Sequence, residues 1–148
     1  MRIAIVALML GLGGCVSVHA PPGGGAAVVG GQAASAVPTR GIDWHAREIG
    51  GVAVPGGSPV TLRFDHRRVS GQVCNHYSGP YELLPGQRIR FGPIFATRMS
   101  CGAAGDAQER RFFGVVSGTA TYQMEGNQLI LTGADGRTIR FVRAGSPG

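Results

Sequence analysis

The chain has 148 residues, 26 of them glycine, and a formal net charge of +6. This length allows one ordinary domain. Every basic side chain is an arginine, and the arginines spread along the whole chain instead of forming a basic block. That distribution favours a solvated arginine-rich surface over a nucleic-acid site, so no nucleic-acid partner is expected.

The first 15 residues have the pattern of a lipoprotein export signal. Residues 3–12 are apolar or glycine, which is too short for a membrane-spanning helix of about 20 residues. Leu12-Gly13-Gly14-Cys15 is typical of a bacterial lipobox, in which Cys15 is lipidated and becomes the first mature residue. Ordinary signal cleavage after Ala20 is the alternative. Because Val16-Ser17 lacks the aspartate linked with inner-membrane retention, we expect a cell-envelope protein attached to the outer membrane and facing the periplasm.

Composition divides the remaining chain into three parts. Residues 16–40 are rich in Gly, Ala and Pro, which indicates a flexible tether. The folded domain is expected at residues 41–143, and residues 144–148 are expected to form a disordered tail.

Alternation with a period of two dominates the domain. In Val60–Phe64, the apolar residues share one face and Arg63 lies on the other. The same alternation predicts further strands at residues 88–91, 119–124, 128–132 and 137–142. Asp135-Gly136 is typical of a tight hairpin turn. These patterns predict an antiparallel sheet with one packed face and one solvated face.

One helix is predicted between the strands. Asp106 is the expected N-cap, and Glu109, three residues later, completes a capping-box pattern. Phe112 and Val116 follow at a spacing that places both on one helix face.

Two cysteines remain once Cys15 is assigned to lipidation. In an oxidising compartment, an even pair such as Cys74 and Cys101 is expected to form a disulfide. The loop-closure model gives such a bond about 3–4 kcal/mol of stabilisation. Two free buried thiols are the alternative.

Several short motifs resemble the META domain family of HslJ-like envelope lipoproteins. The specific ones are Cys74-Asn75, Tyr77-Ser78-Gly79 and Thr97-Arg98-Met99-Ser100-Cys101, and the similarity covers about residues 42–142. The resemblance implies a mainly β (α+β) domain, in which a curved, partly closed antiparallel sheet or half-barrel has one short helix packed against it. It also implies a link to stress or antibiotic tolerance, with no established catalytic residues.

These motif residues are interpreted as structural. Asn75 is expected to bond to local backbone in a tight connection that includes Tyr77 and Gly79. Gly71 and Gly79 are expected to adopt backbone conformations that are closed to other residues. The structural motif comprises Gly71, Asn75, Tyr77, Gly79, Thr97 and Met99.

Metal and catalytic alternatives carry less weight. Cys74, His76 and Cys101, with His45 or His66, offer four ligands for zinc or copper. Their spacing is irregular, and pairing of the cysteines removes a thiolate nucleophile. We therefore predict no catalytic residue, no metal and no cofactor.

The sequence thus predicts a non-catalytic envelope lipoprotein that acts as a binding or stress- and antibiotic-tolerance factor. The lipid on Cys15 is its expected membrane anchor, and an envelope protein or a hydrophobic ligand is its expected partner. Trp44, Tyr77 and Tyr81 are expected to pack inside the sheet rather than rim a ligand surface. The first alternative is a pilot-like module that carries an acyl chain or peptide inside an incompletely closed sheet. A metal-binding or cysteine-dependent protein is the second.

Overall fold

The computed structural model describes residues 40–57 and 59–145. The predicted signal segment with Cys15, nearly all of the predicted tether and residues 146–148 of the predicted tail lie outside the described residues. The expectations of lipidation and of signal cleavage therefore stay predictions.

Ten strands and one helix make up the described part of the chain. In order they are β1 (Asp43–Ile49), β2 (Val52–Ala53), β3 (Thr61–Asp65), β4 (Arg68–Gln72), β5 (His76–Leu84), β6 (Arg88–Phe91), β7 (Phe95–Ala96), α1 (Gly102–Val115), β8 (Gly118–Glu125), β9 (Gln128–Thr132) and β10 (Thr138–Arg143). The five strands predicted from alternation are β3, β6, β8, β9 and β10, each within one residue of its predicted bounds. Their alternation was informative because each has one face in the core and one in water.

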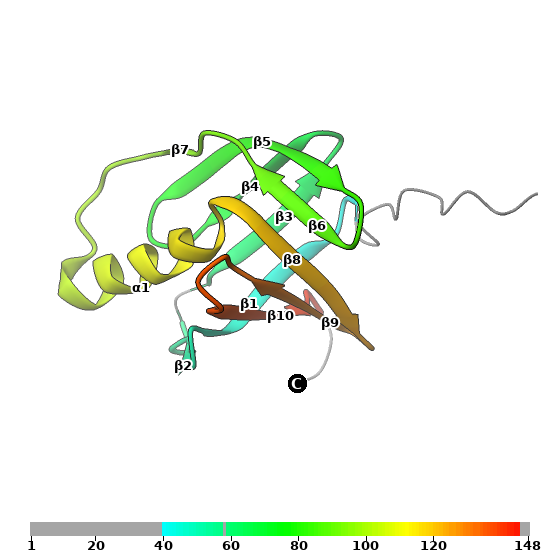
Figure 1. Ribbon diagram of the computed structural model, residues 1–148. Coiled ribbons are helices and arrows are strands. Elements are labelled where there is room, and N and C mark those ends of the chain that lie inside the picture. Colours follow the sequence, from blue (N-terminus) through cyan, green and yellow to red (C-terminus); the bar gives the residue numbers. More distant parts are fainter. Residues whose placement is uncertain (1–39, 58, 146–148) are drawn as a thin grey trace, which may run out of the picture. The chain divides into compact units, whose positions relative to one another are not determined.

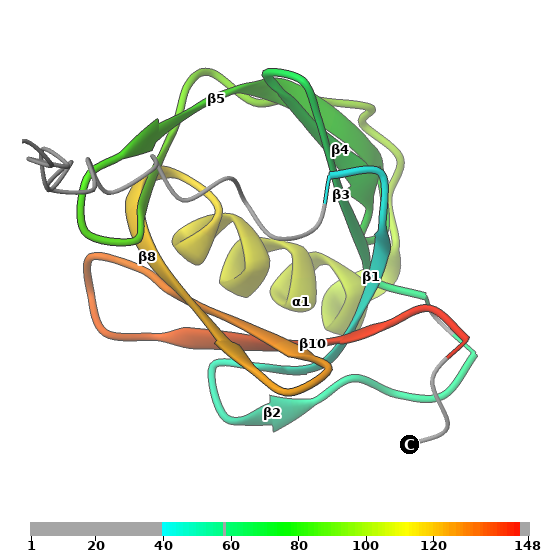
Figure 2. The same cartoon turned by 90° about the vertical axis from the view of Figure 1, so that its right-hand side faces the viewer.

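The antiparallel sheet closes on itself. Its order is β10-β9-β8-β6-β5-β4-β3-β1, and β1 pairs in turn with β10 (Figure 2). Trp44 lies opposite Arg143 and Ile49 lies opposite Ile139 across this closing pair. A register shift between Ala46 and Glu48 marks a bulge in β1, which bends the strand. The predicted mainly β fold with a curved sheet and one helix is confirmed, and the half-barrel is a closed barrel of eight strands.

Large side chains fill the interior of the barrel. Trp44, Phe64 and Phe141 are fully buried, and each comes from a different strand of the ring. Tyr77 and Tyr81 are also buried, and the ring of Tyr81 packs edge-to-face on Phe64 with 5.1 Å between ring centroids. These aromatic residues therefore pack inside the sheet, as expected, rather than rimming a ligand surface.

The helix α1 lies across one end of the barrel (Figures 1 and 2). Phe112 is fully buried and its ring lies 5.2 Å from that of Tyr77 and 6.4 Å from that of Phe141, measured between centroids. The predicted N-cap is wrong: α1 begins at Gly102, and Cys101 occupies the N-cap position. Asp106 is already inside the helix, and its carboxylate reaches back to accept the backbone N–H of Cys101 at 3.2 Å. Within the part of the chain that the structure describes, no helix has the length and apolarity needed to cross a membrane.

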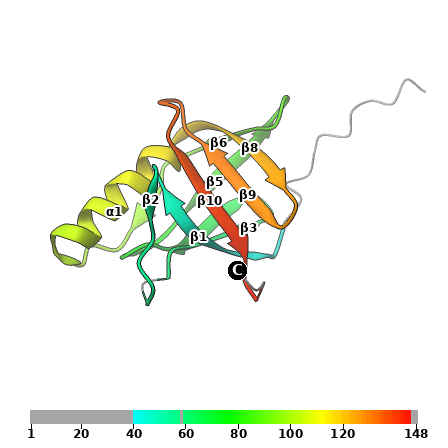
Figure 3. The ribbon, with the colours of Figure 1, turned by 90° about the horizontal axis from the view of Figure 1, so that it is seen from below.

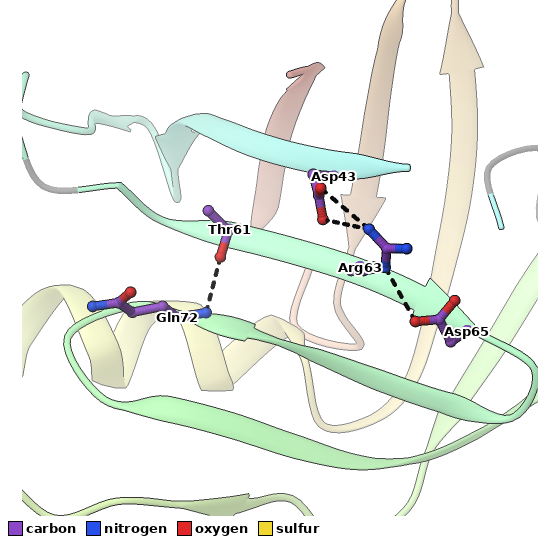
Figure 4. Close-up of polar contacts among 5 residues, drawn as sticks. All are labelled: Asp43, Thr61, Arg63, Asp65 and Gln72. Atoms are coloured by element: carbon purple, nitrogen blue, oxygen red, sulfur yellow. Dashed lines mark hydrogen bonds and ion pairs between the residues drawn. The ribbon is translucent and has the colours of Figure 1, made fainter. Parts of the chain in front are cut away.

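Several arginines on the outer face are paired with carboxylates. Arg63 on β3 donates to Asp43 on β1 and to Asp65, each at 3.1 Å, and Thr61 accepts the backbone N–H of Gln72 at 3.0 Å beside them (Figure 4). The hydrogen bond to Asp43, followed by the one to Asp65, raises the pKa of Arg63 above its ordinary value. These pairs are exposed, so each contributes little to stability, and they agree with the expected solvated arginine-rich surface.

Candidate functional site

The structure brings most of the family-like motif residues together around one buried amide. Asn75, in the turn between β4 and β5, is only 4 % exposed. The segment of residues 97–101, between β7 and α1, passes on one side of Asn75, and Glu109 of α1 lies on the other. We call this group of contacts the Asn75 clasp, because it joins the sheet, the segment and the helix.

Every polar atom of the Asn75 side chain is used in the clasp. Its Oδ1 accepts the backbone N–H of Met99 at 2.8 Å and the hydroxyl of Thr97 at 3.0 Å. Its Nδ2 donates to the Met99 carbonyl at 3.1 Å and to Glu109 Oε2 at 3.0 Å. The backbone N–H of Asn75 also donates to Glu109, at 3.2 Å. When every hydrogen bond of a buried amide is made within the protein, the amide fixes the local structure. It is then not available as a reactive group.

The expectation that Asn75 bonds to local backbone is therefore wrong. Its side-chain partners lie 22, 24 and 34 residues farther along the chain. Glu109 was assigned to a capping box, and in the structure it instead binds Asn75. The sequence held no signal for this contact, because it depends on how α1 is placed against the turn.

A disulfide covers the outer side of the clasp. Cys74 is bonded to Cys101, with their Cα atoms 6.1 Å apart, so the β4–β5 turn is linked covalently to the N-cap of α1. Among the described residues, the group close enough to share a metal ion consists of these two sulfurs and a Glu109 oxygen, all within 4.8 Å. The suggested histidine ligands His45, His66 and His76 do not belong to that group. Sulfurs bonded to each other do not supply the thiolates that a zinc site requires.

Gly71 and Gly79 are needed for close approach rather than for an unusual backbone conformation. A Cβ built on Gly71 would lie 2.1 Å from the Thr61 carbonyl oxygen, and one on Gly79 would lie 2.6 Å from the Pro93 carbonyl oxygen. Neither glycine has a positive φ, so the expected conformational reason is wrong. The residues from Tyr77 onward also lie within β5, not in the predicted connection.

Tyr77 completes this part of the structure. Its hydroxyl donates to the Thr61 carbonyl at 2.9 Å, across the space that the absent side chain of Gly71 leaves open. Burial raises the pKa of Tyr77 well above its ordinary value, so the phenol stays protonated and remains a donor. Tyr77 and Gly71 therefore form one packing unit.

Two hollows on the surface border the clasp. One, of about 730 Å³, is lined by Asn75, Arg110 and the segment of residues 97–100, and its outer rim carries Met99 with 61 % exposure. The other lies between β7 and α1, beside Phe95, whose exposure is 74 %. Exposed apolar side chains of this size are typical of contact surfaces when they cluster. The polar atoms of the Asn75 side chain at the centre of the clasp already have hydrogen-bond partners.

The comparisons with known proteins agree with this structure. A family model for the META domain matches residues 37–146.

The chain belongs to the META domain family. The chain is similar to a protein from Burkholderia xenovorans solved by NMR, with 28 % identity and a TM-score of 0.58 over 72 % of this chain and 84 % of that one. A second NMR structure is similar at 21 % identity and a TM-score of 0.62, covering 72 % of this chain and 92 % of the other, and shows the fold alone. No curated protein matches the chain.

Proposed function

We propose that this META domain protein is a non-catalytic lipoprotein of the cell envelope that acts as a binding or stress-tolerance factor. The observation that carries the proposal is the Asn75 clasp. Within the family motifs, Asn75 bonds to Thr97 and Met99, and Cys74 bonds to Cys101. Together with the bond from Asn75 to Glu109 these contacts hold α1 against the barrel, so the residues specify a scaffold instead of presenting a reactive group. The domain's exposed surfaces are then left for binding.

The titratable side chains of the domain support a non-catalytic role. The thiols of Cys74 and Cys101 are bonded to each other, which removes the nucleophile that a cysteine-dependent enzyme needs. Glu109 accepts hydrogen bonds from Asn75, and Asp106 accepts one from backbone. General acid–base catalysis needs a positioned group that can exchange a proton with substrate, and these carboxylates already have structural partners.

Membrane attachment is the second part of the proposal. Leu12-Gly13-Gly14-Cys15 follows an apolar run that fits an export signal, and a lipid on Cys15 supplies membrane affinity to a domain whose described residues include no spanning helix. The proposed site is the outer membrane, with the domain in the periplasm. An envelope protein or a hydrophobic ligand is the proposed partner.

The carrier alternative has less support in the fold. It requires an incompletely closed sheet, yet the sheet closes through β1 and β10. Trp44, Phe64, Phe112 and Phe141 are all fully buried within it. A ligand inside this barrel would have to displace several of these side chains, and close-packed interiors resist such insertion.

Labelling with a radioactive fatty acid tests the anchor. The wild-type chain should carry the label and sediment with the membrane fraction, whereas Cys15→Ala should lack the label and appear in the soluble envelope fraction. Ser17→Ala is the matched control, since it changes a neighbouring residue and leaves the lipobox intact. A wild-type protein that is exported, soluble and unlabelled contradicts the proposal.

Crosslinking in intact cells tests the binding role. Formaldehyde treatment followed by purification of the wild-type chain should recover an envelope component that Cys15→Ala recovers much less. If both chains recover the same components in the same amounts, anchoring does not direct the interaction. If neither recovers any component above a control strain, the proposed binding role fails.

A further inference from the structure

A groove separates α1 from the connection between β1 and β3. The groove has a volume of about 820 Å³, and one of its walls is formed by β2 and by Pro55, Gly57 and Pro59 of the connection that follows it. Figure 3 shows β2 alongside α1 at this place. The disulfide of Cys74 and Cys101 also lines the groove, whereas the residues that form the hydrogen bonds of the Asn75 clasp do not.

The walls of the groove are mainly apolar. Val52 and Pro55 face it from the β1–β3 connection, Val73 from the end of β4, and Ala104 and Ala107 from α1. Val52 is 48 % exposed, so part of its aliphatic side chain is accessible to a ligand in the groove. An apolar groove of this kind favours a ligand that has an apolar part of its own.

Arg111 is the single charged residue among the described residues that line this groove. Its Nε is buried and has no hydrogen-bond partner, and no ion pair or hydrogen bond of Arg111 is present among the described residues. Arg63 and Arg137, in contrast, each have a carboxylate partner. A buried donor without an acceptor is costly, and an unpaired cation in an apolar wall attracts an anion.

Gln108 adds a second polar group to the groove. It lies three residues before Arg111 on α1 and therefore on a neighbouring part of the same helix surface. The residue as a whole is 9 % exposed, and its side chain makes no hydrogen bond to the described residues. Its amide atoms are not fully enclosed, so they can be reached from the groove. Both residues line the same groove. A guanidinium and an amide thus line the same mainly apolar groove.

We propose that this groove binds a small molecule in which a carboxylate is attached to an apolar chain. The planar guanidinium of Arg111 matches the two oxygens of a carboxylate, and charge-assisted bonds of this type are the strong ones. The Gln108 amide donates to the same headgroup, and the apolar chain lies along Val52, Ala104 and Ala107. Charge complementarity selects the carboxylate, because the groove lining presents one positive charge and no negative one.

This inference deepens the proposed non-catalytic binding role and rests on it, because it names a class of ligand. The anchoring experiment does not involve the groove, so lipidation of Cys15 and binding at Arg111 can each fail without the other.

Titration of the full chain with octanoate tests the inference. The protein is held in phosphatidylcholine nanodiscs, and the Nε–H signals of its arginines are followed by NMR while binding is measured by calorimetry. Octanoate should shift the signal of Arg111, and octanol, which has the same chain without the charge, should bind at least about tenfold more weakly, as expected for loss of a charge-assisted hydrogen bond. Equal binding of the two probes contradicts the role of Arg111.

Substitutions locate the site. Arg111→Ala should weaken octanoate binding by about tenfold or more, while Arg110→Ala, which removes the same charge from an exposed neighbour outside the groove, should change it by less than about twofold. Ala104→Phe fills the groove from an exposed position and should also weaken binding without unfolding the domain. Equal effects of Arg110→Ala and Arg111→Ala, unchanged binding in Ala104→Phe, or the absence of any octanoate binding each overturn the proposal.

Discussion

Replacing Asn75 by Ala removes the centre of the clasp while leaving the disulfide in place. The substitution deletes four side-chain hydrogen bonds of 3.1 Å or less, to Thr97, to Glu109 Oε2 and two to Met99, and a longer one of 3.4 Å to Glu109 Oε1. A typical net value of about 1 kcal/mol for each bond sets an upper estimate of about 4 kcal/mol. Thr97 and Met99 lie in an exposed segment, where water can replace some of their lost hydrogen bonds to Asn75. We therefore expect Asn75→Ala to lower the free energy of unfolding by about 2–4 kcal/mol.

Urea unfolding monitored by fluorescence measures this loss, because the chain has one tryptophan and Trp44 is fully buried. Asn127→Ala, at an exposed turn position, is the matched control and should change stability by less than about 0.5 kcal/mol. Trypsin supplies a local readout, since release of the segment should speed cleavage after Arg98. If Asn75→Ala is as stable as the control and Arg98 is cut no faster, the clasp does not hold α1 to the sheet.

Three further outcomes are expected. Substituting both Cys74 and Cys101 by Ser should lower the free energy of unfolding by about 3–4 kcal/mol in urea titrations, and an unchanged midpoint would argue against the disulfide. Gly71→Ala should destabilise the domain by more than about 2 kcal/mol in thermal unfolding, because its Cβ would meet the Thr61 carbonyl; a neutral result contradicts the close approach. Burial raises the pKa of Tyr77, so an unfolded chain ionises this phenol above about pH 10 while the folded chain does not, and stability falls as pH rises past that point. Tyr77→Phe should flatten this alkaline loss in urea titrations between neutral and alkaline pH, and an identical pH profile would exclude Tyr77 as its source.

The strands were predictable because their signal is local. In β3, Leu62 and Phe64 are fully buried while Arg63 is partly exposed, so the alternation in the sequence reports the two environments directly. Closure of the barrel has no such signal. It depends on pairing between β1 and β10, whose partners Trp44 and Arg143 lie at opposite ends of the domain sequence.

The same holds for the candidate site: local sequence patterns identified residues in it, but contacts between residues far apart in the chain were not predicted. Asn75, Thr97 and Met99 were all found as motif residues, but the hydrogen bonds between them were not, because polar residues in a short Asn-, Ser- and Gly-containing stretch are also typical of turns. The helix start was misplaced for a related reason. Asp106 has the chemistry of an N-cap, whereas Cys101 takes that position through the contacts that fix it to Cys74. No pattern in the sequence marked Arg111 as a ligand-binding residue, since only the folded chain shows that its Nε lacks a hydrogen-bond partner.

The closing pair of strands also brings the two ends of the folded domain to one place. The backbone N–H of Ala144 donates to the carbonyl of Asp43 at 2.8 Å, where β1 begins and β10 has just ended. This junction lies at the end of the barrel away from α1 (Figures 1 and 3). A load applied between the two termini would therefore peel β1 from β10 one hydrogen bond at a time. It would reach the helix last, so the helical end is mechanically shielded from whatever the chain is attached to.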